Sequence, residues 1–489
     1  MPGDRLLALD LGTTSVRALV VAPDGVVLGR AREALEIDFP RPGWVEQDPE
    51  AMWARAVTVM RAALAAANTH AEELAGLGLV SQRGTSLAWD ARDGRPLAPA
   101  IGWQDRRTDA RVAELNRQGV AINALASATK LQWLVEECPA VRRLADAGHL
   151  RMGTLDAWLG ERLSGGACTV TDPGQAGATA LYAAEKGTFS ARTAGFFGLD
   201  LGWLPEVVPT SAVVGETPAD LLGASVALAA RAGDQQAAAF AQGAVTAGLA
   251  KLTLGTSAMI DLCTGAAPIV DQPGFYPLPL FTLADGTRAF CLEGTVITAA
   301  AAVDWLVEVG ILGSARDLDA LAGSVPDAAG VCFVPALQGL GSPHLDGAAR
   351  GLLIGLTRGT TRAHLARATL EGVAHRCVDV VDGLSSHFAG AGTGASTPLA
   401  VDGGLAQSNL LVQRLADLLG RPVVRAAETE TTALGAALLA GLATNVYADI
   451  PEALGARRPG TRFDPATTAE SRLESRDTWS KAIQRTRSR

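Results

Sequence analysis

The sequence predicts a mixed α/β domain that occurs twice, with a cleft between the two copies. In each half a short apolar segment runs into a Gly-Thr turn and returns as a second extended segment, first over residues 6–21 and again over residues 252–262. Helices then alternate with strands, which is the order typical of α/β folds. The 489 residues are enough for two large domains, and we expect an internal duplication with its boundary near residues 240–250. The expected segments are a domain over residues 1–242, a domain over residues 243–455, and a polar, surface-bound or frayed tail over residues 456–489.

Short-range signals mark the individual elements. Asp-Gly pairs at residues 24–25, 93–94 and 285–286 separate extended segments and predict hairpin turns. Asp48 is the expected N-cap of a helix that starts at Pro49. The strands expected beside the turns are residues 6–9, 16–21, 26–28, 77–80, 87–89, 99–101, 252–254, 258–262, 281–283, 288–290, 331–334 and 399–401.

The composition excludes several classes of function. The net charge is −9, from 42 basic and 51 acidic residues, and such an acidic surface repels the phosphate backbone of nucleic acids. Apolar runs stay short of the roughly eighteen residues that a membrane helix needs, and the N-terminus has no uncharged signal-peptide core. The six cysteines form no CxxC pair, so free thiols in a reducing cytoplasm are expected. We expect a cytoplasmic protein with neither nucleic acid nor membrane as partner, and the sequence leaves a homodimer open.

Two common nucleotide-binding classes can be tested against the sequence. A P-loop requires Gly-Lys followed by Ser or Thr, and none of the four lysines follows a glycine. Residues 390–395 carry the letters of a dinucleotide fingerprint, GAGTGA, but they precede a strand-like segment instead of opening a helix after one. Both classes are excluded, which leaves the Gly-Thr turns as candidate phosphate sites.

The first Gly-Thr turn is DLGTTSVR at residues 10–17, and the second is LGTS at residues 254–257. Glycine lets main-chain N–H groups approach an anion closely, and Arg17 adds a positive charge. Asp10, at the end of its strand, can hold Mg²⁺ through water. One such turn alone is most often a plain hairpin, but two at matching places of a repeat favour a triphosphate gripped from both sides.

A third candidate is DGGLAQSN, residues 402–409, which follows an expected strand. A strand that runs into Gly-Gly and then a helix offers a close approach to the flat face of a ligand. The alternative is a tight turn that binds nothing.

Taken together, these segments resemble the FGGY family of carbohydrate kinases, from residue 6 to about residue 442. AGDQQAA at residues 232–238 is especially characteristic, and the C-terminal signature of the family matches at residues 351–356 and 364–371. The resemblance implies two domains of the actin-like ATPase (ribonuclease H-like) fold with an interdomain cleft. The other matching stretches are residues 10–17, 43–49, 81–83, 103–108, 129–134, 153–159, 292–294, 339–343 and 432–437.

The resemblance implies an ATP-dependent transfer of a phosphoryl group to a hydroxyl of a small sugar or polyol, with ATP and Mg²⁺ as cofactors. Asp234 is implied as the general base, a role worth roughly 10²–10⁴-fold in rate, and Asp10 as the residue that organises Mg²⁺. The alternative for Asp234 is a helix cap beside Gly233. The residues implied at the phosphates are Thr13, Thr14, Arg17, Gly255 and Thr256, and those implied beside the adenosine are Gly404 and Asn409.

The acceptor pocket departs from that of family members that phosphorylate glycerol. A polar group left without its partner costs about 1–3 kcal/mol, and Gly84 frees volume. We therefore expect a longer acceptor, a four- or five-carbon polyol or ketose, or a cyclic polyol. The alternative is glycerol itself, with neighbouring residues restoring the lost contacts. The matching residues are Arg83, Trp103, Asp234 and Gln235, and the departures are Gly84 for a glutamate, Leu125 for a tyrosine and Met259 for a phenylalanine.

Two other functions share parts of this pattern. An actin- or chaperone-type ATPase would hydrolyse ATP without a sugar, and a regulatory relative would have lost turnover. No long hydrophobic peptide-binding segment follows residue 455, which weakens the first alternative. Asp10, Arg17 and Asp234 are all present, which weakens the second.

Overall fold

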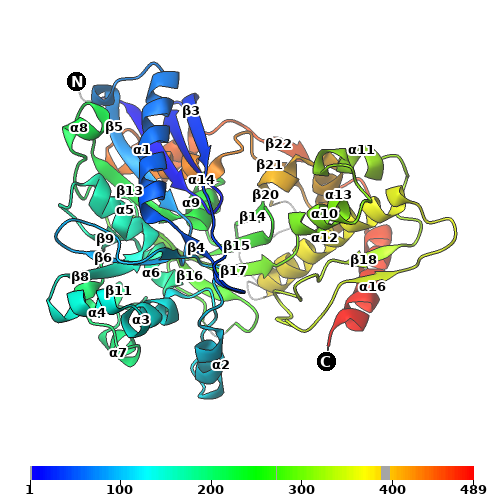
Figure 1. Ribbon diagram of the computed structural model, residues 1–489. Coiled ribbons are helices and arrows are strands. Elements are labelled where there is room, and N and C mark those ends of the chain that lie inside the picture. Colours follow the sequence, from blue (N-terminus) through cyan, green and yellow to red (C-terminus); the bar gives the residue numbers. More distant parts are fainter. Residues whose placement is uncertain (1–2, 271, 387–396, 489) are drawn as a thin grey trace. The chain divides into compact units, whose positions relative to one another are not determined.

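The computed structural model describes residues 3–270, 272–386 and 397–488, so the GAGTGA segment at residues 390–395 lies outside the described residues. The described chain divides into two compact units (Figure 1). Unit 1 consists of Met1–Ala241, Leu278–Arg288 and Thr432–Arg458, and unit 2 of Gln242–Pro277, Ala289–Thr431 and Pro459–Arg489. The first change of unit falls where the sequence places its boundary. Two segments from the second half of the chain belong to unit 1 in addition.

The main sheet of unit 1 has the strand order β13-β5-β1-β2-β3. The strands β1, β2 and β3 are antiparallel neighbours, whereas β5 and β13 run parallel to β1. The turn between β2 and β3 contains the expected Asp24-Gly25 pair, with Gly25 at φ 75°. The strands are β1 Arg5–Leu11, β2 Ser15–Val21, β3 Val27–Ala34, β5 Leu74–Ser81 and β13 Leu228–Gly233.

Helices cover both faces of this sheet, which explains why β1 is apolar on both of its faces. Helix α1 (Pro49–Ala66) packs on β2 and β3 (Figure 1). Its N-cap is Asp48, as expected, since the carboxylate accepts a hydrogen bond from the Glu50 N–H at 2.9 Å. Helix α14 (Thr431–Ala443) comes so close to β5 that a Cβ on Gly78 would lie 2.2 Å from the Ala436 carbonyl oxygen.

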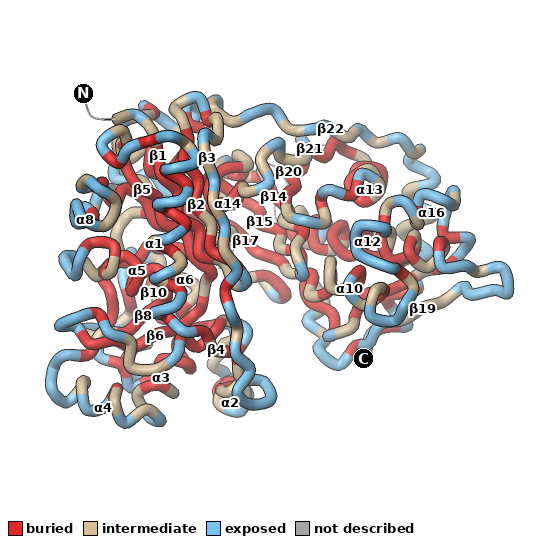
Figure 2. Tube along the Cα trace, turned by 45° about the horizontal axis from the view of Figure 1, so that its top comes forward, coloured by how far each residue is buried: buried red, intermediate tan, exposed pale blue. Residues whose placement is uncertain are grey.

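The main sheet of unit 2 has the strand order β16-β17-β15-β14-β20-β21-β22. Its strands β17-β15-β14-β20-β21 repeat the order and the directions of β3-β2-β1-β5-β13, which confirms the expected duplication of the fold. Figure 2 shows the central strands β1, β2, β14 and β15 as largely buried, and α12 and α13 belong to the core of unit 2. The elements are β14 Ala250–Leu254, β15 Ala258–Gly265, β16 Tyr276–Thr282, β17 Arg288–Val296, β20 Leu399–Asp402, β21 Val423–Arg425, β22 Thr461–Phe463, α12 Arg362–Ser386 and α13 Asn409–Leu419.

A smaller sheet of unit 1 has the order β4-β7-β6-β8 and carries several of the stretches noted in the sequence. Its strands are β4 Glu46–Gln47, β6 Ser86–Asp90, β7 Ala100–Ile101 and β8 Leu150–Thr154. Helices α3 Ser127–Glu137, α4 Pro139–Asp146 and α5 Leu155–Leu163 pack on this sheet, whereas α6 Pro173–Ala178 and α9 Asp234–Ala241 contact β13 of the main sheet. Helix α2 Asp109–Arg117 lies between β7 and α3 in the chain.

The last part of the chain differs from the polar tail expected over residues 456–489. The strand β22 pairs with β21 at the edge of the unit 2 sheet, and helix α16 (Ala469–Thr486) follows. Trp479 is 2% exposed, and its indole N–H donates to the Asp379 carboxylate at 2.9 Å. Trp479, Ala482 and Ile483 form one buried stripe with helical spacing. The stripe is too sparse in apolar residues to stand out in a segment rich in arginine.

No helix in the described parts of the chain has both the length and the apolar character that crossing a membrane requires.

Candidate active site

The first Gly-Thr turn joins β1 to β2 and places an acid beside a base. The Gly12 N–H donates to the Ser15 carbonyl oxygen at 3.0 Å and closes the turn. Asp10 and Arg17 face each other directly in the register of the two strands. Arg17 Nη1 lies 3.3 Å from Asp10 Oδ2, and the side chain of Asp10 is only 3% exposed. The turn therefore lies next to a buried carboxylate that is paired with a partly exposed arginine.

Side chains from distant stretches hold this turn in place. The Trp103 indole N–H donates to Thr13 Oγ1 at 3.0 Å, and Gln47 Nε2 donates to the Thr13 carbonyl oxygen at 2.9 Å. Gln82 Nε2 in turn donates to Gln47 Oε1 at 2.7 Å. The structure thus joins Thr13, expected at the phosphates, to Trp103, expected at the acceptor. Sequence reasoning gave Gln47 and Gln82 no role, although both lie in stretches that match the family; Thr14 is exposed at the tip of the turn.

The surroundings of Asp10 fit a metal ion that arrives with a nucleotide. Among the described residues no cluster of three or more His, Cys, Asp or Glu side chains is placed to hold a metal ion. Mg²⁺ in kinase sites commonly uses one or two carboxylates and completes its shell with water and phosphate oxygens. One buried carboxylate beside a turn rich in N–H donors suits this mode. Ser15, in the same turn, is buried and its hydroxyl has no hydrogen-bond partner among the described residues.

Asp234 is the first residue of α9, directly after β13. Its Oδ1 accepts from the Gln235 main-chain N–H at 2.9 Å, and Arg83 Nε lies 3.5 Å from the same oxygen. An N-cap carboxylate accepts from the residue two or three positions further on, so this carboxylate does not make the cap contact. A Cβ on Gly233 would lie 2.8 Å from Arg83 Cγ and Cδ, so glycine lets the arginine pass close to the strand end. The structure brings Arg83, Asp234 and Gln235 together as expected, and the Asp234 side chain is 31% exposed.

The expectation that Gly84 enlarges the acceptor pocket is wrong for this structure. Gly84 has φ +74°, a left-handed conformation that favours glycine. A Cβ at this position would lie 2.7 Å from the Leu125 carbonyl oxygen and 3.4 Å from Trp103 Cβ. The main chain at Leu125 therefore fills the space that a side chain at position 84 would need. The Leu125 side chain is 43% exposed.

A buried lysine fixes the main chain at Leu125. Lys130 Nζ donates to the carbonyl oxygens of Ala124 at 2.8 Å and Leu125 at 3.1 Å, and its side chain is fully buried. Burial lowers the pKa of Lys130 to about 8, against the opposing attraction of the Asp105 carboxylate. Ser127 Oγ also donates to the Gly84 carbonyl oxygen at 3.3 Å. The turn at Leu125 and the strand end at Gly84 are thus locked together.

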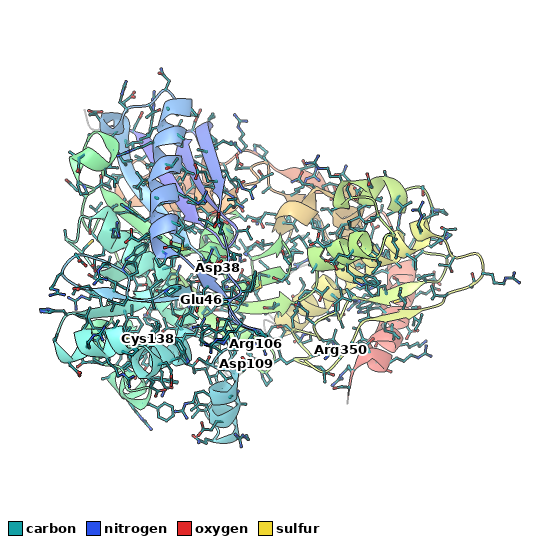
Figure 3. The ribbon with its side chains drawn as sticks, in the orientation of Figure 1. Asp38, Glu46, Arg106, Asp109, Cys138 and Arg350 are labelled. Atoms are coloured by element: carbon teal, nitrogen blue, oxygen red, sulfur yellow. The ribbon has the colours of Figure 1, made fainter. Side chains whose placement is uncertain are left out.

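Charged side chains brace the segment that carries Trp103. Arg107 Nη2 lies 2.7 Å from Glu46 Oε1, and its guanidinium carbon lies 3.7 Å above the centre of the Trp44 ring. Arg106 pairs with Asp109 across 2.6 Å; Figure 3 labels Glu46, Arg106 and Asp109 in this region. A stacked, paired guanidinium is a stiff support, because both its planar face and its edge are engaged.

The second Gly-Thr turn joins β14 to β15 in unit 2. The Gly255 N–H donates to the Ser257 carbonyl oxygen at 3.0 Å, and the Thr256 carbonyl oxygen accepts from the Ala299 N–H at 3.0 Å. Thr256 itself is exposed. Met259 lies on β15 opposite Thr253, and its sulfur is 3.5 Å from Thr295 Oγ1. The register pair that corresponds to Asp10 and Arg17 is therefore Thr253 and Met259, and both of these side chains are uncharged.

The expected adenosine segment follows β20 and touches the second turn. Gly403 has φ 91°, and a Cβ there would lie 2.5 Å from the Leu254 carbonyl oxygen. The chain then forms the short 3₁₀ helix η4 (Gly404–Gln407) and enters α13 at Asn409. Asn409 is exposed, and its Oδ1 accepts from Arg425 Nη1 at 2.8 Å. Sequence reasoning missed Arg425, which stands at the end of β21 with no motif around it.

Comparisons with known proteins identify the family of the chain. The model of the FGGY carbohydrate kinase N-terminal domain matches residues 5–241, and that of the C-terminal domain matches residues 250–444. A glycerol kinase of Aromatoleum aromaticum is 43% identical over 496 residues, covering 99% of this chain and 98% of that protein. A glycerol kinase of Bordetella parapertussis is 43% identical over 494 residues, covering 98% of this chain and 96% of that protein.

Solved structures share the fold over the whole length. The crystal structure of Plasmodium falciparum glycerol kinase with ADP has a TM-score of 0.91 and 25% identity, covering 99% of this chain and 98% of that one. A ligand-bound xylulose kinase of Lactobacillus acidophilus has a TM-score of 0.85 at 18% identity, covering 98% and 97% of the two chains, which shows likeness of fold. The repeated sheet, the paired turns and the matching domain models lead to one conclusion: the chain belongs to the FGGY family of carbohydrate kinases, which are ATP-dependent phosphotransferases.

Proposed function

We propose that the chain transfers the γ-phosphoryl group of ATP to a hydroxyl of glycerol, giving glycerol 3-phosphate. The observation that carries this proposal is the 43% identity over 99% of the chain with a glycerol kinase. The longer acceptor expected from the sequence has less support, because Leu125 fills the space beside Gly84. Glycerol was the alternative in that expectation and is now the first choice.

In this proposal Asp234 takes the proton of the attacking hydroxyl while the phosphoryl group moves. A single carboxylate suffices, since positioning and charge stabilisation supply most of the remaining acceleration. Arg83 lies 3.5 Å from this carboxylate and fixes its direction. Trp103 and Gln235 complete the acceptor side, with Gly84, Leu125 and Met259 at the positions that depart from the family pattern.

The phosphates of ATP are assigned to both Gly-Thr turns, through Thr13, Thr14 and Arg17 of unit 1 and Gly255 and Thr256 of unit 2. Mg²⁺, when bound with the nucleotide, neutralises the charge that develops on the phosphate oxygens. Asp10 would hold it through water.

The adenosine is assigned to Gly404 and Asn409, and Arg425 donates to Asn409 and to the Ala406 carbonyl oxygen of the same segment. The six cysteines are free, which fits a reducing cytoplasm, and we place the reaction there.

The test is an ADP-release assay with a panel of acceptors. Glycerol is compared with four- to seven-carbon polyols, ketoses and cyclitols, and a reaction without acceptor measures plain ATP hydrolysis. We expect glycerol to have the highest kcat/KM of the panel and the hydrolysis of ATP without acceptor to be slow. Preference for a longer acceptor would restore the first expectation, and fast hydrolysis without acceptor would point to an actin-type ATPase.

A further inference from the structure

The strands β5 and β13 deliver the two residues that meet at the acceptor side. Arg83 follows β5, and Asp234 follows β13. The two strands are parallel neighbours, and their last paired residues are Ser81 and Gly233. The pairing of β5 with β13 ends at these two residues. Strand pairing alone therefore does not fix the separation of Arg83 and Asp234, which lie beyond it.

A buried amide bridges the strands where the ladder ends. Gln175, on α6, is fully buried. Its Nε2 donates to the Ser81 carbonyl oxygen and to Ser81 Oγ, both at 3.0 Å, and lies 3.5 Å from the Ala232 carbonyl oxygen. One side chain thus contacts the last residue of β5 and the residue two before Asp234.

The main chain that carries this side chain is held firmly at the start of α6. The Asp172 carboxylate accepts from the N–H groups of Gln175 at 2.8 Å and Gly174 at 3.1 Å, and from Thr210 Oγ1 at 3.0 Å. A Cβ on Gly174 would lie 3.2 Å from Gln236 Cγ, so the first turns of α6 and α9 are packed closely. A buried residue at the capped start of a helix has little freedom to leave its contacts.

We propose that Gln175 is a positioning residue for the phosphoryl transfer, which holds Arg83 and Asp234 at their working separation by tying the ends of β5 and β13. It touches neither reactant and acts through Asp234. A misplacement of about 1 Å at a reacting group can cost roughly 100-fold in rate, so a bridge at this point matters for kcat. The proposal rests on the proposed role of Asp234 as the base, but not on which acceptor is used.

The test replaces Gln175 by methionine, which keeps the length and removes the amide. We expect kcat with the best acceptor of the panel to fall about 10-fold while KM for ATP stays within about twofold. Gln175→Asn, whose amide is one methylene shorter, should give a smaller loss and serves if the methionine variant does not fold. The matched control is Ser211→Ala, which removes a buried hydrogen bond to the Leu439 carbonyl oxygen at 2.8 Å and leaves Asp172, Ser81 and Ala232 untouched.

The outcomes separate positioning from general loss of stability. A similar loss of Tm in Ser211→Ala and Gln175→Met, with a loss of kcat only in Gln175→Met, supports the proposal. Wild-type kcat in a folded Gln175 variant, or a kcat that falls in proportion to Tm in both variants, overturns it.

A double variant tests the route of the effect. Because Gln175 acts through Asp234, Gln175→Met should cost little more in an Asp234→Asn background, whereas the full 10-fold loss there would overturn the proposal. If Asp234→Asn alone keeps wild-type kcat, the assigned base fails, and this result is separate from the Gln175 measurement.

Discussion

The two Gly-Thr turns occupy the same place in two copies of one sheet, yet they carry different chemistry. In unit 1 the strands β1 and β2 end at the turn with the pair Leu11 and Val16, and the pair before it is Asp10 and Arg17. In unit 2 the corresponding pair is Thr253 and Met259. Both turns are closed by a glycine N–H that donates at 3.0 Å, to Ser15 in one and to Ser257 in the other, so the second turn is one residue shorter.

The same contrast appears at the ends of β13 and β21, which are corresponding strands of the two sheets. In unit 1 β13 leads into Asp234, and in unit 2 β21 ends at Arg425, which donates to Asn409. The duplication has kept the strand order and the turn that offers main-chain N–H groups. The side chains have diverged, so that the carboxylates assigned to metal and acceptor lie in unit 1. This divergence predicts that substitutions at corresponding places of the two units have unequal effects on activity.

The largest effect is expected at Asp234. Asp234→Asn removes the proton acceptor and should lower kcat by at least about 100-fold. Nucleotide binding should survive, since the residues assigned to ATP are elsewhere, and calorimetric titration with ADP checks this. A variant with near-normal kcat would remove Asp234 from the mechanism.

The next effect contrasts Asp10 with its counterpart Thr253. Asp10→Ala should reduce kcat/KM for Mg²⁺-ATP by roughly 100-fold and raise the Mg²⁺ concentration needed for half-maximal rate, with any acceptor. Thr253→Val removes a hydroxyl that accepts from Lys251 at 2.9 Å and should change the same quantities by less than about threefold. If the Mg²⁺ dependence of Asp10→Ala were unchanged, or if both variants lost equal amounts of kcat/KM, Asp10 would have no metal-related role that Thr253 lacks.

Much of the scaffold around these sites could be predicted, because it depends on local signals. Asp24-Gly25 and Asp285-Gly286 form the expected turns, with the glycines at φ 75° and 87°. The short strands beside the Gly-Thr turns were expected from apolar runs alone, and Asp48 caps its helix. These features involve residues within a few positions of one another, where propensity is informative.

The contacts that shape the site could not be predicted in this way. Trp103 and Thr13 are 90 residues apart in the chain, and no local pattern links them. Position 84 shows a different limit: a glycine where the family has a glutamate suggests added space, but Gly84 has a positive φ and a Cβ there would lie 2.7 Å from the Leu125 carbonyl oxygen. Side-chain volume alone is a poor guide where the backbone changes as well.

Each unit also buries a lysine, and the two lysines have different hydrogen-bond partners. Lys251 lies 2.8 Å from the Asp261 carboxylate, whereas Lys130 donates to main-chain carbonyl oxygens. The folded chain releases the Lys130 proton near pH 8, because burial lowers its pKa, whereas the ordinary lysine value is 10.5. Between these values the unfolded chain binds more protons, so the contribution of Lys130 to stability rises with pH.

Lys130→Met tests this directly. From about pH 7.5 to about pH 9.5 the unfolding free energy of the wild type should rise by about 2 kcal/mol relative to the variant, measured by urea denaturation. The charged groups around Lys130 are Asp105, Asp109 and Arg107. Lys186→Met, at an exposed site, is the control and should keep the pH dependence of the wild type. If the difference in unfolding free energy between the wild type and Lys130→Met did not change with pH, the lowered pKa of Lys130 would be contradicted.

The smallest effect is expected at Arg425, the last residue of β21, which is the strand of unit 2 that corresponds to β13. Arg425 Nη1 donates to Asn409 Oδ1 at 2.8 Å and to the Ala406 carbonyl oxygen at 3.2 Å, so it orients the segment assigned to adenosine. Arg425→Met should raise KM for ATP about fivefold with little change in kcat, because the loss is in binding shared by ground and transition states. Arg462→Met is the matched control: Arg462 stands on the neighbouring strand β22, is half exposed and pairs with Asp464. If Arg425→Met lowered kcat as strongly as Asp234→Asn, the two strand ends would share one role, and the contrast between the units would fail at this point.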